Sequence, residues 1–168
     1  RTVTLTSATD EKVYDGTALT RNQQTDVTVT GDGFVDGEGA TYDVTGSQTE
    51  VGSSANAFTY TLNEGTKAAN YEIATVEGTL TVTELTDKVT VTITENSGSE
   101  KYDGSEKTVT GYKVSIDNSL YTEADFTFSG TDSVTGTDAG SYDMELKAAD
   151  FTNTNTNFRT VTFNVTDG

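Results

Sequence analysis

Apolar and polar side chains alternate strictly along many short segments of the chain. The pattern begins at the amino terminus, where threonines separate Val3 and Leu5. Successive side chains of a β-strand point to opposite faces, so each such segment has one apolar face and one threonine-rich face. The alternation recurs in residues 27–29, 58–62, 80–83, 89–93, 142–146 and 161–165. All seven segments are therefore predicted β-strands.

Residues typical of turns lie between these segments. Clusters of Gly, Asn, Asp and Ser, such as residues 31–33 and 96–99, favour turns. Strands with one wet face suit antiparallel sheets, whereas parallel cores contain continuously apolar strands. The helical signal is limited to one short turn around residues 119–125. We therefore predict an all-β fold built from antiparallel sheets.

The chain repeats itself. Tyr14-Asp15-Gly16 returns as Tyr102-Asp103-Gly104, at an offset of 88 residues. The same offset places Val3 on Val91 and Leu5 on Ile93. An offset of 84 places residues 58–62 on 142–146, and one of 83 places Leu80 and Val82 on Phe163 and Val165. We predict two homologous domains, residues 1–84 and 85–168, each a small antiparallel β-sandwich of Ig-like or β-grasp-like topology.

The junction between the two predicted domains is short. Residues 83–88 separate Val82 from Val89 and contain neither glycine nor proline, so this stretch is not a flexible linker. Leu85 is its one apolar residue, and we expect it to pack between the domains. The sequence predicts two domains arranged end to end with a stiff joint.

Composition excludes several classes of site. The chain has no cysteine and no histidine, which excludes disulfides, the usual zinc sites, a thiolate nucleophile and a Ser-His-Asp triad. With a formal net charge of −17, the protein would be repelled by the phosphate backbones of nucleic acids and by anionic lipids. We therefore expect no nucleic-acid partner and no membrane insertion in these residues. The chain opens at Arg1 without methionine and reads as a fragment, so any export signal or anchor is expected outside it.

Several motifs together resemble a known repeat family. Lys12-Val13-Tyr14-Asp15-Gly16-Thr17 is similar to the signature of the MBG/YDG repeats, which occur in tandem in large bacterial surface proteins. Residues 31–34, 69–71 and 78–83 fit the same pattern, whereas Asn157-Phe158 stands in the second half where Asn70-Tyr71 stands in the first. The resemblance implies an extracellular, cell-wall-associated, adhesin-like protein in which such domains form a stalk. It implies no catalytic site.

The repeated Tyr-Asp-Gly motif has two interpretations. In the structural one, the ring of Tyr14 or Tyr102 is buried at a strand end, Asp15 or Asp103 bonds backbone amides, and Gly16 or Gly104 takes a positive φ. In the other, the two tyrosines are exposed platforms on which a carbohydrate stacks.

A cluster of acids suggests a possible metal site. Asp32, Asp36, Glu38 and Asp43 lie within one glycine-rich stretch, and calcium prefers carboxylate oxygens on flexible loops. Their spacing does not follow an EF-hand and the second half lacks the cluster, so a solvated acidic turn is the alternative. No other cofactor is expected. An amide cross-link from Lys12, Lys88 or Lys101 to Asn164 is a further hypothesis, because such a bond would stiffen a cysteine-free domain.

These observations predict a monomeric, non-enzymatic spacer at the bacterial cell surface or cell wall. Its partners would be neighbouring repeats of the same chain. The alternative is a module that binds a host glycan or matrix protein, and a third interpretation is an accessory module of a secreted glycosidase.

Overall fold

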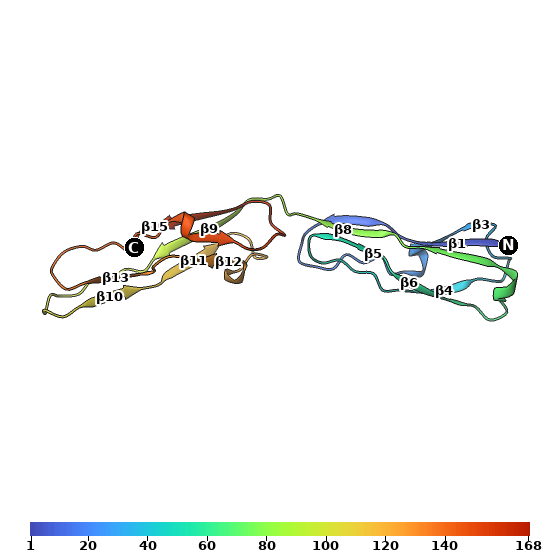
Figure 1. Cartoon of the computed structure of the whole chain (residues 1–168), viewed down its shortest axis with the longest axis horizontal. Coiled ribbons are helices and arrows are strands. Elements are labelled where there is room, and N and C mark those ends of the chain that lie inside the picture. The colour runs from blue at the N-terminus through green and yellow to red at the C-terminus, as the bar shows by residue number, and fades with distance from the viewer. The chain divides into compact units, whose positions relative to one another are not determined.

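The computed structural model describes all of residues 1–168, which divide into two compact units, Arg1–Leu85 and Thr86–Gly168 (Figure 1). The all-β prediction is confirmed, since the only helical elements are four single 3-10 turns. Each unit has its own sheets and its own buried core.

The first unit contains eight strands and two 3-10 turns. In chain order these are β1 Thr2–Ser7, β2 Asp10–Val13, η1 Gln24–Asp26, β3 Val27–Gly31, β4 Ala40–Val44, β5 Gly52–Ala55, β6 Phe58–Leu62, η2 Ala68–Asn70, β7 Glu72–Val76 and β8 Thr79–Thr83. They form two three-stranded sheets, β3-β1-β7 and β2-β8-β5, and a two-stranded sheet of β4 and β6.

The first two strands of this unit pair in parallel with the last two. Strand β1 pairs with β7, with Thr2 opposite Glu72, and β2 pairs with β8, with Val13 opposite Thr83. The register is the same in both pairs, so they form one long ladder with a bend between its halves. The predicted antiparallel pairing is confirmed for β1 with β3, β4 with β6 and β5 with β8. The parallel pairs were not predicted, because alternation shows that one face of a strand is exposed to solvent but not the direction of its neighbour. The intervening residues supply the long connection that a parallel pair requires.

This pairing determines where the chain enters and leaves the unit. Because parallel strands run in the same direction, the start of β1 and the end of β8 lie at opposite ends of the ladder (Figure 1). At about 3.3 Å per residue, the step from residue 72 to residue 83 covers at most roughly 36 Å. The chain therefore enters the first unit at one end of the ladder and leaves it at the other.

Two apolar clusters stabilise the first unit. One gathers the buried residues Val3, Leu5, Val27, Val44 and Tyr71 around β1. The other consists of Leu80 and Val82 of β8 together with Leu19, with Tyr14 and Val51 packed against it. Threonines occupy the alternate positions of both strands, so the predicted division into apolar and threonine-rich faces is confirmed.

The second unit has seven strands and two 3-10 turns. These are β9 Val89–Glu95, β10 Lys107–Thr110, β11 Tyr112–Ile116, η3 Glu123–Asp125, β12 Phe126–Phe128, β13 Ser133–Gly136, η4 Ala148–Asp150, β14 Phe151–Asn153 and β15 Val161–Thr166. The sheets are β11-β9-β15, β10-β13 and β12-β14, and β9 pairs with β15 in parallel. Aromatic residues dominate the core, where Phe126 contacts Tyr121, Phe151 and Phe163.

The last strand of the second unit does not correspond to β8. Phe163 lies opposite Val91 in the β15–β9 pair, as Ile73 lies opposite Val3 in the β7–β1 pair. Strand β15 therefore occupies the place of β7. The offset of 83 residues, which matched β15 with Leu80 and Val82, is wrong because both strands carry the same alternation.

Gly168 of the second unit occupies the position that Gly78 occupies in the first. A Cβ atom added to Gly78 would lie 2.5 Å from the carbonyl oxygen of Ser7, and one added to Gly168 would lie 2.5 Å from that of Glu95. Ser7 and Glu95 are related by the offset of 88 residues. In the first unit β8 begins directly after Gly78. Gly168 thus corresponds to the residue that precedes β8 in the first unit.

The predicted strand at residues 142–146 is also absent, and these residues adopt no regular structure. Alternation favours an extended backbone, but a strand also requires a hydrogen-bonding neighbour, and none lies beside this segment.

Candidate functional site

The Tyr-Asp-Gly turn of the first unit follows β2. The Asp15 carboxylate accepts hydrogen bonds from the Thr17 amide at 2.9 Å and from the Thr17 hydroxyl at 2.7 Å, and it pairs with the Lys12 ammonium at 2.9 Å. These contacts, the Thr17 hydroxyl first, hold the pKa of Asp15 well below its ordinary value. Gly16 follows at a φ of 79°, which residues with a Cβ resist.

The second unit repeats this turn with a different lysine. The Asp103 carboxylate accepts hydrogen bonds from the amide and hydroxyl of Ser105 and from Lys107 Nζ at 2.9 Å. The Ser105 hydroxyl contributes most to lowering the pKa of Asp103 to about 2. Gly104 has a φ of 80°. The lysine that pairs with the aspartate precedes the motif in the first unit and follows it in the second. The hydrogen bonds from the residue after the glycine to the aspartate are the same in both turns.

The tyrosines of the two motifs have different environments. Tyr14 is half-buried and packs against the cluster of Leu19, Leu80 and Val82. The side chain of Tyr102 is 66% exposed. The ring of Tyr14 thus packs against apolar side chains, whereas that of Tyr102 is not buried, and the role of the motif stays a prediction.

The four acids predicted to bind calcium make separate contacts. Asp32 accepts a hydrogen bond from the Thr2 amide at 3.0 Å, the main cause of its lowered pKa. Glu38 accepts a hydrogen bond from the Tyr71 hydroxyl, and this contact raises the pKa of Tyr71. Asp36 is exposed in the loop, and Asp43 lies in β4 opposite Thr59. Nowhere in the structure do three or more Asp or Glu side chains form a group that could hold a metal ion. A calcium site at this loop stays a prediction.

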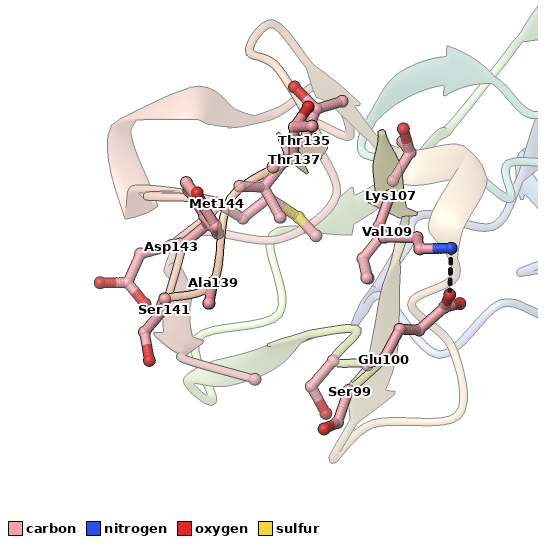
Figure 2. Close-up of a pocket in the computed structure, with 18 of the residues that line it drawn as sticks. Ser99, Glu100, Lys107, Val109, Thr135, Thr137, Ala139, Ser141, Asp143 and Met144 are labelled. Carbon is pink, nitrogen blue, oxygen red and sulfur yellow. Dashed lines mark ion pairs between the residues drawn. The ribbon is translucent and has the colours of Figure 1, made fainter. Parts of the chain in front are cut away.

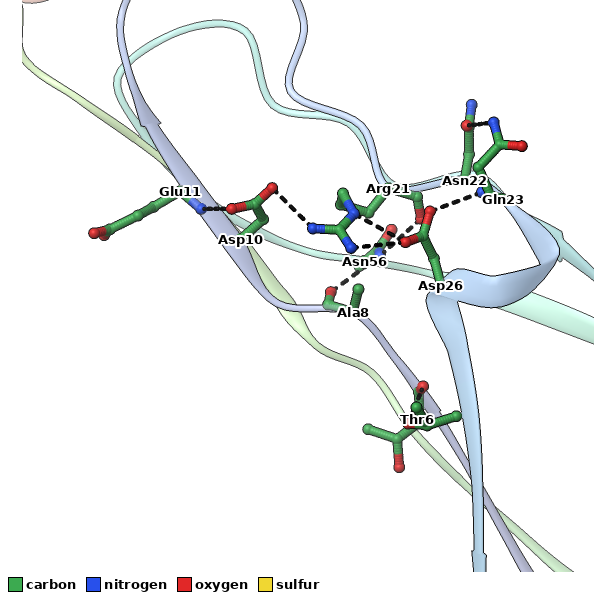
Figure 3. Close-up of polar contacts among 10 residues, drawn as sticks. Thr6, Ala8, Asp10, Glu11, Arg21, Asn22, Gln23, Asp26 and Asn56 are labelled. Atoms are coloured by element: carbon green, nitrogen blue, oxygen red, sulfur yellow. Dashed lines mark hydrogen bonds and ion pairs between the residues drawn. The ribbon is translucent and has the colours of Figure 1, made fainter.

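A polar network at the bend of the first unit escaped sequence analysis (Figure 3). The Arg21 guanidinium donates from Nη1 to Asp10 at 3.1 Å and from Nε to Asp26 at 2.9 Å. Asp26 also accepts the Gln23 amide at 2.9 Å, which is the main cause of its lowered pKa. The network ties β2 to the turn before β3.

Asn56 lies at the same bend with its side chain fully buried. Its Nδ2 donates to the carbonyl oxygens of Ala8 at 3.1 Å and Arg21 at 3.3 Å (Figure 3). The Ser7 hydroxyl donates to the Asn56 carbonyl oxygen at 2.6 Å and accepts the Gly78 amide at 2.9 Å. Only Gly78 belonged to a recognisable motif; Ser7 and Asn56 carry no pattern that would have identified them.

The remaining predicted residues lie apart from these networks. Leu85 is the last residue of the first unit, and its role as a packed joint stays a prediction. The Lys12 ammonium contacts Asp15 and Thr17, and Asn164 is exposed in β15 opposite Thr92. An amide cross-link between a lysine and Asn164 stays a prediction.

Comparison with known proteins gives one match. Residues 88–168, about half of the chain, match the model of the family described as MBG domain, which confirms the resemblance for this range. No curated protein and no solved structure matches the chain. None of its helices has the length and apolar character needed to cross a membrane.

Proposed function

We propose, starting from the match of residues 88–168 to the MBG domain model, that this chain is a non-catalytic spacer. It would be part of the stalk of an extracellular bacterial surface protein, adhesin-like and associated with the cell wall. The first unit supports the proposal because it repeats the Tyr-Asp-Gly turn and the parallel pairing of its terminal strands.

The observation that carries the proposal is the parallel ladder of the first unit. Since β1 starts at one end of this ladder and β8 ends at the other, the unit lengthens the polypeptide path instead of folding it back. A module whose termini lie side by side would add bulk to a stalk without adding reach. Within the second unit β9 and β15 also pair in parallel, so the start of β9 and the end of β15 lie at opposite ends of their own ladder.

A display experiment tests the spacer function. One, two or three copies of the chain are inserted between a membrane anchor and a fluorescent reporter on a bacterial cell. We expect the height of the reporter above the membrane to rise with each added copy. A height that does not change with copy number would contradict the proposal.

A stiff joint predicts a specific effect of Leu85→Gly. We expect this substitution to broaden the distribution of molecular dimensions in small-angle X-ray scattering, because it removes the one apolar side chain of the junction. Thr86→Gly is the matched control, since it adds the same backbone freedom without removing an apolar group. Equal profiles for the two variants would remove Leu85 from the joint.

A second candidate function is binding of a host glycan or matrix protein. It is favoured by Tyr102 and Tyr142, which are 66% and 48% exposed and line the same cavity of the second unit. Exposed tyrosine rings can stack on sugars. Binding of the chain on a glycan array, lost on Tyr102→Ala, would support this function over a purely mechanical one.

A further inference from the structure

Four aspartates in the connections between strands are followed directly by glycine, and this dipeptide rearranges without an enzyme. They are Asp15, Asp32, Asp36 and Asp103. In the first step of the rearrangement, the glycine nitrogen attacks the side-chain carbonyl carbon of a protonated aspartate, and a five-membered succinimide ring forms. Glycine favours this step because it has no side chain to hinder the approach.

The four pairs have similar backbones and similar exposure. The glycine of each pair has a positive φ, between 74° and 84°, and all four aspartates are exposed. Neither property separates one pair from the others. The pairs differ in the contacts that hold the carboxylate, and these contacts decide how freely it reaches the glycine nitrogen.

The two Tyr-Asp-Gly turns hold their carboxylates firmly. In each turn the aspartate accepts the amide and the hydroxyl of the residue after the glycine and contacts a lysine ammonium. In the second unit this lysine, Lys107, also pairs with Glu100 at 3.4 Å (Figure 2). These contacts, the Ser105 hydroxyl first, lower the pKa of Asp103 to about 2, so the protonated form that reacts is scarce at neutral pH.

The pair at Asp32 is held through both of its reacting groups. The Asp32 carboxylate accepts the Thr2 amide at 3.0 Å and the Thr2 hydroxyl at 3.2 Å. The Gly33 amide donates to the Thr2 carbonyl oxygen at 3.3 Å. Attack at this pair therefore requires that the contacts with Thr2 break first.

The carboxylate of Asp36 is not held. Its side chain is exposed and makes no hydrogen bond and no ion pair. A Cβ atom added to Gly37 would meet nothing within 4 Å, so the space around this glycine is open. One backbone hydrogen bond closes the turn, from the Glu38 amide to the Val35 carbonyl oxygen at 2.9 Å. Of the four carboxylates, this one alone approaches the following nitrogen without first leaving a donor.

We propose that Asp36 is a site of spontaneous isomerisation, at which the protein acquires an isoaspartyl residue with time. The Gly37 nitrogen bonds to Cγ of Asp36, and the amide proton leaves with the carboxyl hydroxyl as water. Solvent water then adds to the main-chain carbonyl carbon of the succinimide, and the bond from that carbon to the nitrogen breaks. The peptide link now runs through Cβ and Cγ, the former main-chain carbonyl is the free carboxylate, and the mass is unchanged.

The new link would lengthen the main chain by one carbon atom inside a segment that Tyr71 holds on both sides. The Tyr71 hydroxyl accepts the Val35 amide at 3.1 Å and donates to the Glu38 carboxylate. The ring of Tyr71 belongs to the buried cluster around β1 and lies 5.1 Å, centroid to centroid, from that of Phe34. We expect the longer segment to lose one of the two Tyr71 contacts and the first unit to melt at a lower temperature.

The test stores the full chain for several weeks in warm buffer at neutral pH. Isoaspartate is then located in peptides by electron-transfer dissociation, which gives fragment ions specific to the β-linkage. We expect isoaspartate to form at Asp36 at least about tenfold faster than at each of the other three aspartates, because each of those must first lose a hydrogen bond to a charged carboxylate.

Two controls separate structure from local sequence. In guanidinium chloride the chain is unfolded, so the four Asp-Gly pairs should isomerise at similar rates. In the folded double variant Lys12→Met, Thr17→Val, Asp15 loses two of its three donors while keeping its glycine. We expect isomerisation at Asp15 to rise several-fold in this variant and the rate at Asp36 to stay the same.

Equal rates at the four pairs in the folded chain would overturn the proposal. So would an equally strong preference for Asp36 in guanidinium chloride, because local sequence and not the missing contacts would then be its cause. An unchanged rate at Asp15 in the double variant would show that held carboxylates are not what protects the other pairs. An isomerised first unit with an unchanged melting temperature would contradict the expected loss of a Tyr71 contact.

Discussion

Gly78→Ala is expected to destabilise the first unit by about 3 kcal/mol, at the upper end of the usual cost of forcing an atom into a packed site. A Cβ atom at this position would lie 2.3 Å from the carbonyl oxygen of Ala8 and 2.5 Å from that of Ser7. Both are backbone atoms, so the clash cannot be relieved by rotating a side chain. The bend between the two halves of the ladder would have to open.

Differential scanning calorimetry measures this loss, with the transition of the second unit as an internal reference. Gly39→Ala is the matched control, because its Cβ would approach only the Nδ2 atom of the Asn63 side chain, at 3.3 Å. An equal fall in melting temperature for the two substitutions would contradict this prediction. It would show that the close approach of the backbone at Gly78 does not stabilise the bend.

Asn56→Asp is expected to cost about 4 kcal/mol at pH 7, the range for an unpaired buried charge. The asparagine Nδ2 donates to two carbonyl oxygens, and its Oδ1 is buried without a hydrogen-bond partner. An aspartate would lose both donated bonds and would place a carboxylate against two acceptors. Asn63→Asp, at an exposed position, introduces the same charge and should change the free energy of unfolding little.

The cost of Asn56→Asp should depend on pH. Burial without a donor raises the pKa of the new carboxyl in the folded state above its unfolded value of about 3.9. The folded state then holds the proton more tightly, so stability relative to the wild type is greatest below that pH and falls as the pH rises. Urea denaturation at pH 3.5 and pH 7 measures the difference. A cost independent of pH would mean that the carboxylate reaches solvent.

The strands could be predicted from the sequence because alternation is a local property. Burial in β9 alternates residue by residue, as the threonine pattern requires. The hydrogen-bonding partner of a strand is not local, and this accounts for the errors. The segment at residues 142–146 has the alternation of a strand but no neighbour to pair with. Likewise, β15 resembles β8 in pattern and occupies the place of β7.

The same distinction applies to the candidate site. The contacts of Asp15 with Thr17 and the positive φ of Gly16 lie within a few residues of one another, so ordinary turn chemistry was sufficient to anticipate them. The bond from Gly78 to Ser7 joins residues 71 positions apart, and the bond from Ser7 to Asn56 joins residues 49 apart. No local pattern identifies such partners. The motif alone left both a buried and an exposed tyrosine open, because burial depends on which distant residues pack around the ring. Tyr14 packs against the cluster of Leu80 and Val82, whereas Tyr102 is 66% exposed.

The parallel ladder of the first unit also determines how this unit meets tension. A force that pulls on the two termini drags β1 and β8 in opposite directions along their own axes, because they start and end at opposite ends of the ladder. The inter-strand hydrogen bonds are then loaded together in shear instead of being peeled apart one at a time. Under such loading the lifetime of the fold is governed by its unfolding rate, not by its equilibrium stability. The topology that gives the unit its reach is thus also the one that suits it to bearing a load.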